Sequence, residues 1–356
     1  MKMLPSAPYT HANSSVTRTM TLVMLALSPA TLLGLYQFGW PAIFLFVTTI
    51  ATAIVAEALC LMIAKKPVRL HLADGSAILS AWIVALTLPP WAPWWIGVSG
   101  ALIAIVIGKQ IFGGIGQNVF NPAMVARVML LVSFPLEMTR FVNARPLFSD
   151  AAPGFIEGLR IFLASGVNYD ALSSPSVLGF VRMEISRGLP LSEVLDKAYN
   201  PLSLFLGTAN GSMGEVSALL ILLGGLFLVY KRIITWHTPA SMIAAMILLA
   251  GIFHLISPEK YPDPIYQLLT GAFMLGAFFI ATDYVTVPST RTGRMIFGAG
   301  CGALVFVIRS WAAFPEGVAF SILLMNALTP VIDYYVKPRI YGRTRKGEPL
   351  DPPERS

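Results

Sequence analysis

The chain has 356 residues, of which 56% are hydrophobic and only 12% are charged, and its mean hydropathy is +0.70. Soluble domains carry roughly 25% charged residues, so this composition excludes an ordinary soluble protein and predicts a polytopic membrane protein. The formal net charge of +7 does not indicate a nucleic-acid partner, because the basic residues lie between apolar runs and reflect membrane topology.

Ten apolar segments follow in chain order. They lie near residues 20–38, 41–64, 76–90, 94–111, 120–135, 216–230, 239–256, 266–283, 294–309 and 317–335. A helix that crosses a bilayer needs about 20 mostly apolar residues, and several of these segments are shorter or contain proline or glycine. Broken helices of this kind line functional sites in transporters. We therefore predict an all-α polytopic membrane protein with about ten transmembrane helices.

The two cysteines do not indicate a disulfide framework or an iron–sulfur cluster. The cysteines, Cys60 and Cys301, lie inside apolar segments, and an iron–sulfur cluster held by one chain usually needs four. We interpret both as small buried hydrophobic residues and expect no metal site.

The first twenty residues are polar and the first apolar segment is followed at once by others, so no cleavable signal peptide is evident.

Orientation follows from the basic residues, because short cytoplasmic loops are enriched in lysine and arginine. Basic residues follow the second, fourth, sixth and tenth segments and precede the ninth: Lys65, Lys66, Arg69, Lys109, Lys231, Arg232, Lys337, Arg339 and Arg291, Arg294. All of them lie on one side if the segments cross in turn. We predict that both termini are cytoplasmic and that the long polar segment is extracytoplasmic.

The predicted organisation has four parts. Residues 1–135 hold the cytoplasmic N-terminus and a first five-helix repeat, and residues 136–215 form the extracytoplasmic segment. Residues 216–336 form a second five-helix repeat, and residues 337–356 form a basic cytoplasmic tail. The repeat is indicated by GALIAIV at 100–106 and GALVFVI at 302–308, with similar segments before and after each. Because five is odd, the two repeats are expected to be inverted relative to each other, with the functional site where they meet.

Four charged residues lie within or at the ends of the predicted spans. Charges there are costly and usually functional. Glu57 and Asp283 are candidates for an ion pathway, whereas Asp333 fits a position at the water interface. Arg127 requires a partner, and pairing with Glu57 would make it purely structural.

The glycine-rich stretch GKQIFGGIGQNVFNPAMVAR, at 108–127, is the most unusual part of the chain. Asn121 before Pro122 fits a helix N-cap followed by proline at the first helical position. One interpretation is a well-capped loop. The other is a binding pocket for a polar ring, lined by Gln117, Asn118, Asn121 and Arg127.

Long ordered segments identify a family resemblance. GIGQNVFNPAMVARVMLLVSFP, GSMGEVSALLILLGGLFLVY, LLTGAFMLGAFFIATDYVTVPST and PEGVAFSILLMNALTPVIDYYVKPRIYG resemble the D-type membrane component of the Rnf electron-transport complex, which is related to the B-type component of the sodium-translocating NADH:quinone reductase. The resemblance runs from about 20 to 342. It implies ten transmembrane helices in two inverted repeats, in the inner membrane of a prokaryote.

The resemblance also implies a function. The family forms part of a six-subunit translocase that links electron transfer between ferredoxin and NAD to the movement of Na⁺ or H⁺, so the chain would act with other Rnf-type subunits rather than as an enzyme alone. It implies FMN joined by a phosphoester to a threonine in an extracytoplasmic Ser-Gly-Ala-Thr motif, attached by a flavin transferase. A second, non-covalent flavin such as riboflavin is bound in the related reductase component.

The polar stretch NYDALSSPSVLG, at 168–179, is similar to the family's flavin-attachment pattern. Asp170, Ser173, Ser174 and Ser176 fall on that pattern, and Ser176 stands where the family has its threonine. Pro175 replaces the family's alanine, which is a departure because proline fixes its own φ and removes an N–H. The resemblance implies covalent FMN at Ser176.

Other functions are compatible with the residues alone. A channel or carrier of the urea or ammonium type has a similar ten-helix inverted architecture and needs no redox cofactor. A structural membrane subunit with a lost flavin site is the third possibility. Visible flavin absorbance of the purified chain separates the first function from the other two.

Overall fold

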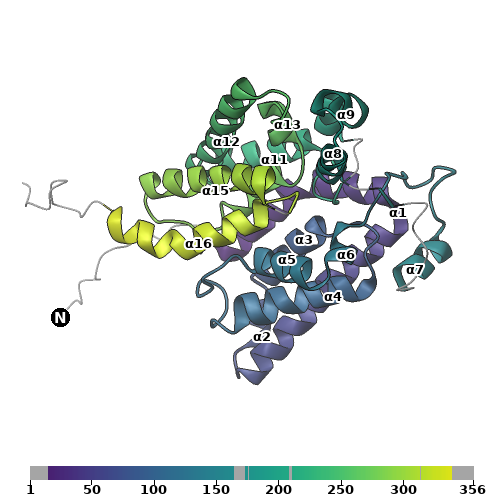
Figure 1. The fold of residues 1–356 in the computed structure, drawn as a ribbon. Coiled ribbons are helices and arrows are strands. Elements are labelled where there is room, and N and C mark those ends of the chain that lie inside the picture. The colour runs from purple at the N-terminus through teal and green to yellow at the C-terminus, as the bar shows by residue number, and fades with distance from the viewer. Residues whose placement is uncertain (1–14, 164–172, 175, 208–210, 313, 339–356) are drawn as a thin grey trace, which may run out of the picture.

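The computed structural model describes residues 15–163, 173–174, 176–207, 211–312 and 314–338. Asp170 and Pro175 of the flavin-attachment-like stretch, and most of the basic tail, lie outside the described residues. Within the described part, helices dominate and are arranged in two groups joined through the first helix, as Figure 1 shows.

The first helix group comprises the elements up to the fifth α-helix. Its elements are α1 (Val16–Ile63), α2 (Val68–Leu72), α3 (Ser76–Thr87), α4 (Trp94–Leu102), the π-helix η1 (Ile103–Gln110) and α5 (Pro122–Ser133). The α3 and α4 helices pack on α1, and α5 packs on η1 and α3.

The long α1 helix is two predicted spans joined by a sharp bend. Gly39 has φ 70° and ψ −156°, a non-helical conformation that glycine adopts without steric cost, and Pro41 follows it. The two arms of α1 diverge from this bend in Figure 1. They coincide with the spans predicted near 20–38 and 41–64, so the chain changes direction at the predicted point.

The connecting segment between the two groups contains short elements. These are α6 (Pro135–Thr139), β1 (Phe141–Val142), α7 (Phe155–Leu163), β2 (Ser173–Ser174), α8 (Val177–Ser186), α9 (Leu191–Ala198) and α10 (Pro201–Leu206). Strands β1 and β2 pair antiparallel, with Phe141 opposite Ser174 and Val142 opposite Ser173, so the purely α prediction misses one small sheet. The α8 and α9 helices bury Leu178, Val181 and Val194 against Tyr266 of the second group.

The second helix group follows. Its elements are α11 (Ala218–Tyr230), α12 (His237–Ile256), α13 (Pro264–Leu269), α14 (Phe273–Leu275), the π-helix η2 (Gly276–Ile280), α15 (Arg291–Trp311) and α16 (Val318–Tyr335). The α12 and α15 helices approach closely because Gly302 faces the backbone of Met242, where any Cβ would overlap its carbonyl oxygen. The span predicted near 266–283 is broken at Gly271, which has φ +65°.

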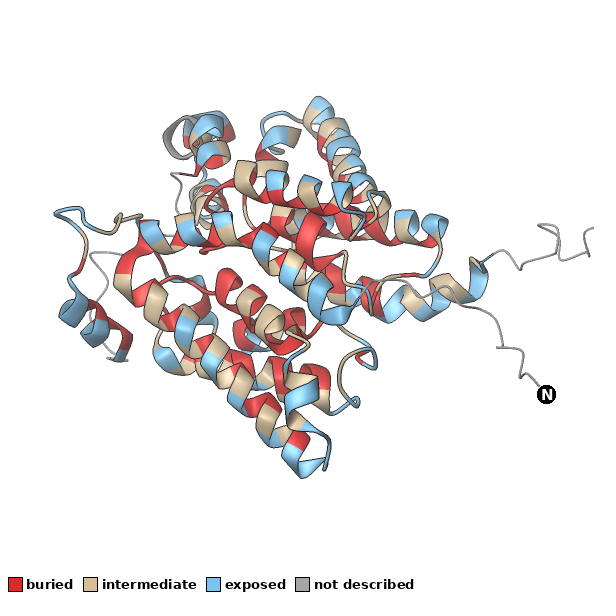
Figure 2. Cartoon of the chain, turned by 180° about the vertical axis from the view of Figure 1, so that it is seen from behind, coloured by how far each residue is buried: buried red, intermediate tan, exposed pale blue. Residues whose placement is uncertain are grey.

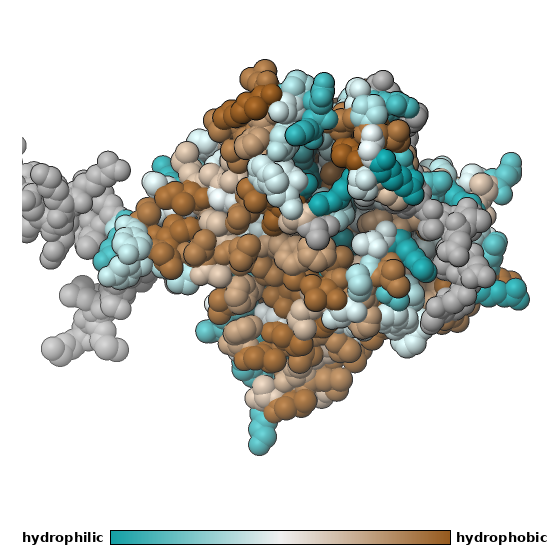
Figure 3. Space-filling model, in the orientation of Figure 1, coloured by the Kyte–Doolittle hydropathy of each residue, from teal (hydrophilic) through white to brown (hydrophobic). Residues whose placement is uncertain are grey.

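Surface and burial patterns agree with a helical membrane protein. In Figure 2 the buried residues gather on the helices inside the molecule, and exposed residues recur along the outward helices. In Figure 3 hydrophobic side chains cover much of the surface over α16 and the first group, while hydrophilic ones gather toward α8, α9 and α13. Among the described residues, α1, α12, α15 and α16 are long and apolar enough to cross a bilayer, and α3, α4 with η1, α5 and α11 are shorter apolar helices.

Candidate functional site

A buried ion pair joins the two helix groups. Nη2 of Arg127, on α5, lies 3.2 Å from Oε2 of Glu316, in the turn before α16, and the two side chains are 7% and 20% exposed. Nη1 of Arg127 donates to the carbonyl oxygen of Thr87 at the end of α3. Oε1 of Glu316 accepts from the backbone N–H of Ala272 at 2.9 Å. Arg127 therefore has its partner in Glu316 and not in Glu57.

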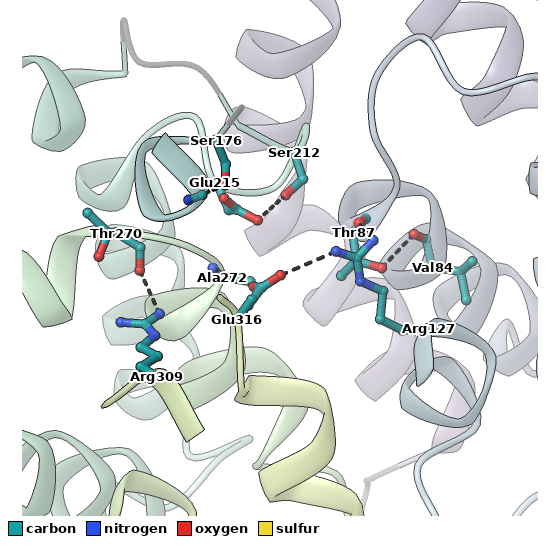
Figure 4. A network of polar contacts seen from close by, with 11 residues as sticks. Val84, Thr87, Arg127, Ser176, Ser212, Glu215, Thr270, Ala272, Arg309 and Glu316 are labelled. Carbon is teal, nitrogen blue, oxygen red and sulfur yellow. Dashed lines mark hydrogen bonds and ion pairs between the residues drawn. The ribbon is translucent and has the colours of Figure 1, made fainter. Parts of the chain in front are cut away.

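A second arginine lies near this ion pair, as Figure 4 shows. Nη1 of Arg309 donates to the carbonyl oxygen of Gln267 at 2.6 Å, and Nη2 donates to that of Thr270 at 2.8 Å. These contacts satisfy carbonyl groups at the end of α13, which have no partner within the helix. Nε of Arg309 is buried without a hydrogen-bond partner among the described residues.

Glu215 belongs to the same polar region. It lies in the connection before α11, and its Oε1 accepts from the Ser212 hydroxyl at 2.6 Å. Burial, and next the negative charge of Glu316, raise the pKa of the Glu215 carboxyl to about 7. A carboxyl group that is partly protonated near neutral pH therefore adjoins the ion pair between the helix groups.

The start of α8 reaches this region. Ser176 is the N-cap of α8, and its hydroxyl accepts from the backbone N–H of Gly179 at 3.2 Å. A Cβ at Gly271 would lie 2.7 Å from the side chain of Leu178 and 2.9 Å from Nη2 of Arg309, so Leu178 in the first turn of α8 and Arg309 both lie beside Gly271. Only the backbone of Ser173 and Ser174 is described, in β2.

A cavity of about 860 Å³ lies between the first and the second helix group. Its wall is formed by the start of α1, α3, the glycine-rich stretch, the end of α11 and the end of η2. Among the residues lining it, the polar and charged ones are Ser15, Arg18, Thr19, Ser76, Ser80, Lys109, Asn118, Asn121, Lys231, Arg232, Thr282, Asp283 and Tyr284. Four of these are basic and one is acidic, so the cavity favours an anionic or strongly polar occupant.

The four residues proposed to share one pocket are separated by the structure. Asn118 and Asn121 line the large cavity, whereas Gln117 is exposed and outside its wall. Arg127 lines a smaller cavity with Thr87 and Glu316. The structure does not bring Gln117 and Arg127 to the cavity of Asn118 and Asn121, because residues that follow one another through a glycine-rich turn and into a helix need not face the same way.

Asn121 has the capping geometry predicted from the sequence. Its Oδ1 accepts from the backbone N–H groups of Ala123 and Met124 at 3.1 and 3.3 Å, which confirms the N-cap of α5. Its own backbone N–H donates to Oδ1 of Asn326 on α16 at 3.1 Å. The capped start of α5 thus also fastens the two helix groups together.

Glu57 is paired inside the first group. Its Oε1 lies 2.5 Å from Nζ of Lys109 and accepts from Nε2 of Gln110 at 2.9 Å, and both charged side chains are almost completely buried. Lys109 also donates to the Ser76 hydroxyl at 2.7 Å. The sequence indicates only a topology signal at Lys109, so its buried pairing is a new finding.

The two remaining acidic residues differ in their surroundings. Asp283 lines the large cavity, and its carboxylate accepts from the backbone N–H of Val285 and the hydroxyl of Thr286 at 3.4 and 3.3 Å. Asp333 accepts from the backbone N–H of Ser289 at 3.0 Å and from its hydroxyl at 3.1 Å, and this contact is exposed. Asp333 therefore holds the turn before α15.

Sequence reasoning missed Glu316, Arg309, Glu215 and Lys109. One signal was available for Glu316, because an arginine inside an apolar helix requires an acidic partner and Glu316 lies directly before an apolar segment. No comparable signal pointed to Arg309 and the start of α8 lying near each other, because both lie beside the break at Gly271.

The chain is similar to known proteins along nearly its whole length. The sequence pattern of the NQR2, RnfD, RnfE family matches residues 3–342. A protein of Stutzerimonas stutzeri, named as the D subunit of an ion-translocating oxidoreductase complex, is 54% identical over 337 residues, which are 95% of each chain. Proteins of the same name from Halorhodospira halophila and Rhodobacter capsulatus are each 49% identical, over 98% and 86% of both chains respectively.

Proposed function

Because the chain belongs to the NQR2, RnfD, RnfE family, we propose that it is the D-type membrane subunit of an ion-translocating oxidoreductase complex and that it carries flavin. The observation that carries this proposal is the identity of 49–54% with proteins of that name across most of both chains. Its electrons pass between ferredoxin and NAD, and their flow drives Na⁺ or H⁺ across the membrane. The other Rnf-type subunits and a flavin transferase are its partners.

The topology that accompanies this function is the one predicted from the basic loops. We propose ten crossings of a prokaryotic inner membrane in two inverted repeats, with both termini cytoplasmic. The bend at Gly39 supports a change of direction between the first two crossings, and the break at Gly271 supports a discontinuous eighth crossing. On this topology Ser176 lies on the extracytoplasmic side and the large cavity opens toward the cytoplasm.

The proposed covalent FMN site is Ser176. Its hydroxyl accepts a hydrogen bond from Gly179, and an ester oxygen at that position retains a lone pair for the same contact. The N-terminal turn of α8 presents backbone N–H groups, which suit a phosphate, and Arg309 and Leu178 of that turn both lie beside Gly271. FMN supplies one- and two-electron transfer when bound, and the residues present here suit its phosphate.

The large cavity is the proposed site of a second, non-covalent flavin such as riboflavin. Its volume of about 860 Å³ lies in the range of roughly 300–1,000 Å³ that is typical of cofactor sites. Asn118 and Asn121 supply amide groups in its wall, and the aromatic rings of Phe278, Phe279 and Tyr284 supply apolar surface.

The ion pathway is proposed to use Glu57 and Asp283. Asp283 borders the cavity directly, and Glu57 is joined to it through Lys109 and Ser76, which also line the wall. Carboxylates next to a polar cavity inside a membrane are the usual groups for binding a cation or a proton in transit.

The experiment that tests this function is the intact mass of the denatured chain, isolated from the complex after expression with the flavin transferase. We expect a covalently bound FMN in the native sequence, none in Ser176→Ala, and an unchanged mass increment in the control Ser149→Ala, an exposed serine of the same connecting segment. A denatured native chain without FMN, from a complex assembled with all its partners, would contradict covalent attachment.

A further inference from the structure

The short helix α7 exposes apolar side chains although it belongs to the polar connecting segment. Its nine residues are too few to cross a bilayer, and in Figure 1 it lies at the outer edge of the molecule beside α1. Its buried residues are Gly158, Ile161 and Phe162. Its exposed apolar residues are Phe155, Ile156, Leu159 and Leu163. Apolar side chains therefore cover more of this helix than its packing within the chain uses.

The buried, exposed apolar and charged residues of α7 occupy three successive sides of the helix. With 3.6 residues per turn, the four exposed apolar side chains cover an arc of about 100° that adjoins the buried side. Glu157 and Arg160 are exposed and lie together on the remaining side. This order is typical of a helix that lies in the plane of a membrane surface, with its apolar side in lipid and its charged side toward water.

The α7 helix is fixed on the bend of α1. A Cβ at Gly158 would lie 2.7 Å from Cβ of Trp40 and 3.3 Å from Cδ of Pro41, so the two backbones approach closely there. The ring of Phe155 packs edge-on against Trp40 and Phe44, at centroid distances of 5.0 and 5.3 Å. These contacts fix which side of α7 faces α1 and which side faces outward.

The chain that leads to α7 is held at the same bend. Pro41 has no N–H to offer the carbonyl group of Gln37, and the backbone N–H of Arg145 donates to it instead at 2.8 Å. The backbone N–H of Leu147 donates to the carbonyl oxygen of Tyr36 at 2.7 Å. The position of α7 beside the bend is therefore set from both its packing and its approach.

The bend marks a level at the membrane surface. It joins the first two proposed crossings, so on the proposed topology it lies on the extracytoplasmic side. Nε1 of Trp91, in the loop between α3 and α4, donates to the carbonyl oxygen of Phe38 at 2.9 Å, which places that loop at the same level. Trp40 and Trp94 begin the next two helical segments there, and tryptophan is enriched at membrane–water interfaces.

The exposed side of α7 continues an outward apolar surface of α1. Val47 lies one turn beyond Phe44 on the same side of α1, and it is 58% exposed. Phe44 itself contacts Phe155 of α7. Four partly exposed side chains supply much less than the roughly 800 Å² that each partner buries in a stable protein interface. Lipid chains are therefore the occupant that suits this surface, because they already cover the adjoining side of a helix that crosses the bilayer.

We propose that α7 is an interfacial membrane anchor, with Phe155, Ile156, Leu159 and Leu163 among the lipid chains of the extracytoplasmic leaflet and with Glu157 and Arg160 at the headgroups. The inference goes beyond the proposed function and uses only its topology. Strands β1 and β2, which precede and follow α7 in the chain, pair with each other. The anchor thereby fixes the height of this strand pair, which directly precedes the Ser176 region, above the membrane.

The test is fluorescence quenching in the whole complex, reconstituted in vesicles of phosphatidylethanolamine and phosphatidylglycerol. A fluorescent amino acid is introduced at position 156, which is 70% exposed, or at the matched position 157 on the charged side of the same helix. Position 47 on α1 is the control for contact with lipid. The quenchers are a lipid with a nitroxide on its acyl chain near the headgroup, and iodide on both sides of the membrane. We expect the nitroxide lipid to quench position 156 roughly threefold more than position 157, and iodide to show the reverse order.

Two results would overturn the anchor. Equal iodide quenching at positions 156 and 157, with quenching of position 47 by the nitroxide lipid, shows that α7 lies in water. Protection of position 156 from both quenchers shows that another subunit covers it instead of lipid. The FMN content of each chain is measured separately by intact mass, so either result is distinct from a failure of the proposed function.

Discussion

Two ion pairs in this chain are similar in chemistry but differ in how many of their carboxylate oxygens have hydrogen-bond partners. Glu316 uses both carboxylate oxygens, one for Arg127 and one for the backbone N–H of Ala272. Glu57 uses only one, for Lys109 and Gln110, and leaves the other without a partner among the described residues. The first pair joins the two helix groups, whereas the second lies inside the first group, where Lys109 borders a cavity lined by both groups. We therefore expect the pair of Arg127 and Glu316 to hold the two groups together and the pair of Glu57 and Lys109 to take part in ion movement.

The largest loss of stability is expected when the ion pair between Arg127 and Glu316 is broken. Glu316→Ala leaves Arg127 buried without a counter-charge and removes the contact to Ala272. Loss of one partner of a buried ion pair costs about 3–5 kcal/mol of the free energy of unfolding. Thermal unfolding of the purified complex measures this, and Glu259→Ala, at an exposed glutamate, is the control. An unfolding temperature equal to that of the control would show that the pair does not fasten the two groups.

A smaller loss of stability is expected when the hydrogen bond between Ser76 and Lys109 is removed. Ser76→Ala removes one acceptor of the Lys109 ammonium, and a hydrogen bond to a charged group contributes about 1.5–3 kcal/mol to stability. Ser80→Ala is the matched control, because Ser80 lies one turn further along α3 and also lines the cavity. We expect a lower unfolding temperature for Ser76→Ala alone. Equal losses in the two variants would mean that the hydroxyl of Ser76 does not hold Lys109.

The sequence predicts where the helices and the buried charges lie better than it predicts which charged residues pair. Apolar runs locate the helices to within a few residues, as for α3 and α16, and Asn121 before Pro122 locates the start of α5. The position of Arg127 in an apolar helix shows that it needs a partner. Glu316, however, is 189 residues away, and pairing at that separation depends on the packing of the helix groups.

Backbone irregularities are the other limit on prediction. The π-helices η1 and η2 set which side chains reach the large cavity, and apolar periodicity does not distinguish a π-turn from an α-turn. Lys109 lies at the end of η1, so its burial cannot be inferred from its place beside a loop. The hydrogen bonds of Arg309 to the end of α13 cannot be predicted either, because Gly271 redirects the chain just after that helix.

The smallest expected effect is a pH dependence of the unfolding temperature, caused by Glu215 beside the pair of Arg127 and Glu316. Burial raises the pKa of Glu215 from its ordinary value of 4.5 to about 7 in the folded protein. The folded state therefore binds this proton more tightly than the unfolded state, so the associated stability is present below about pH 4.5 and is lost as the pH rises toward 7. Unfolding temperatures of the complex between pH 5 and 8 should fall less steeply in Glu215→Gln than in the native sequence. Parallel curves would remove Glu215 from the groups that titrate on unfolding.

The most direct test of the difference between the two pairs is ion movement per electron in sealed vesicles that contain the complex. Each pair is replaced as a whole, by Glu57→Gln/Lys109→Met and by Arg127→Met/Glu316→Gln, because neutral replacement of both partners is tolerated better than loss of one. At equal flavin content and equal electron-transfer rate, the first variant should lose ion translocation, and the second should keep the native ratio of ions to electrons despite a changed unfolding temperature. A native ratio in the first variant, or a lost ratio in the second, would contradict the division of roles between the two pairs.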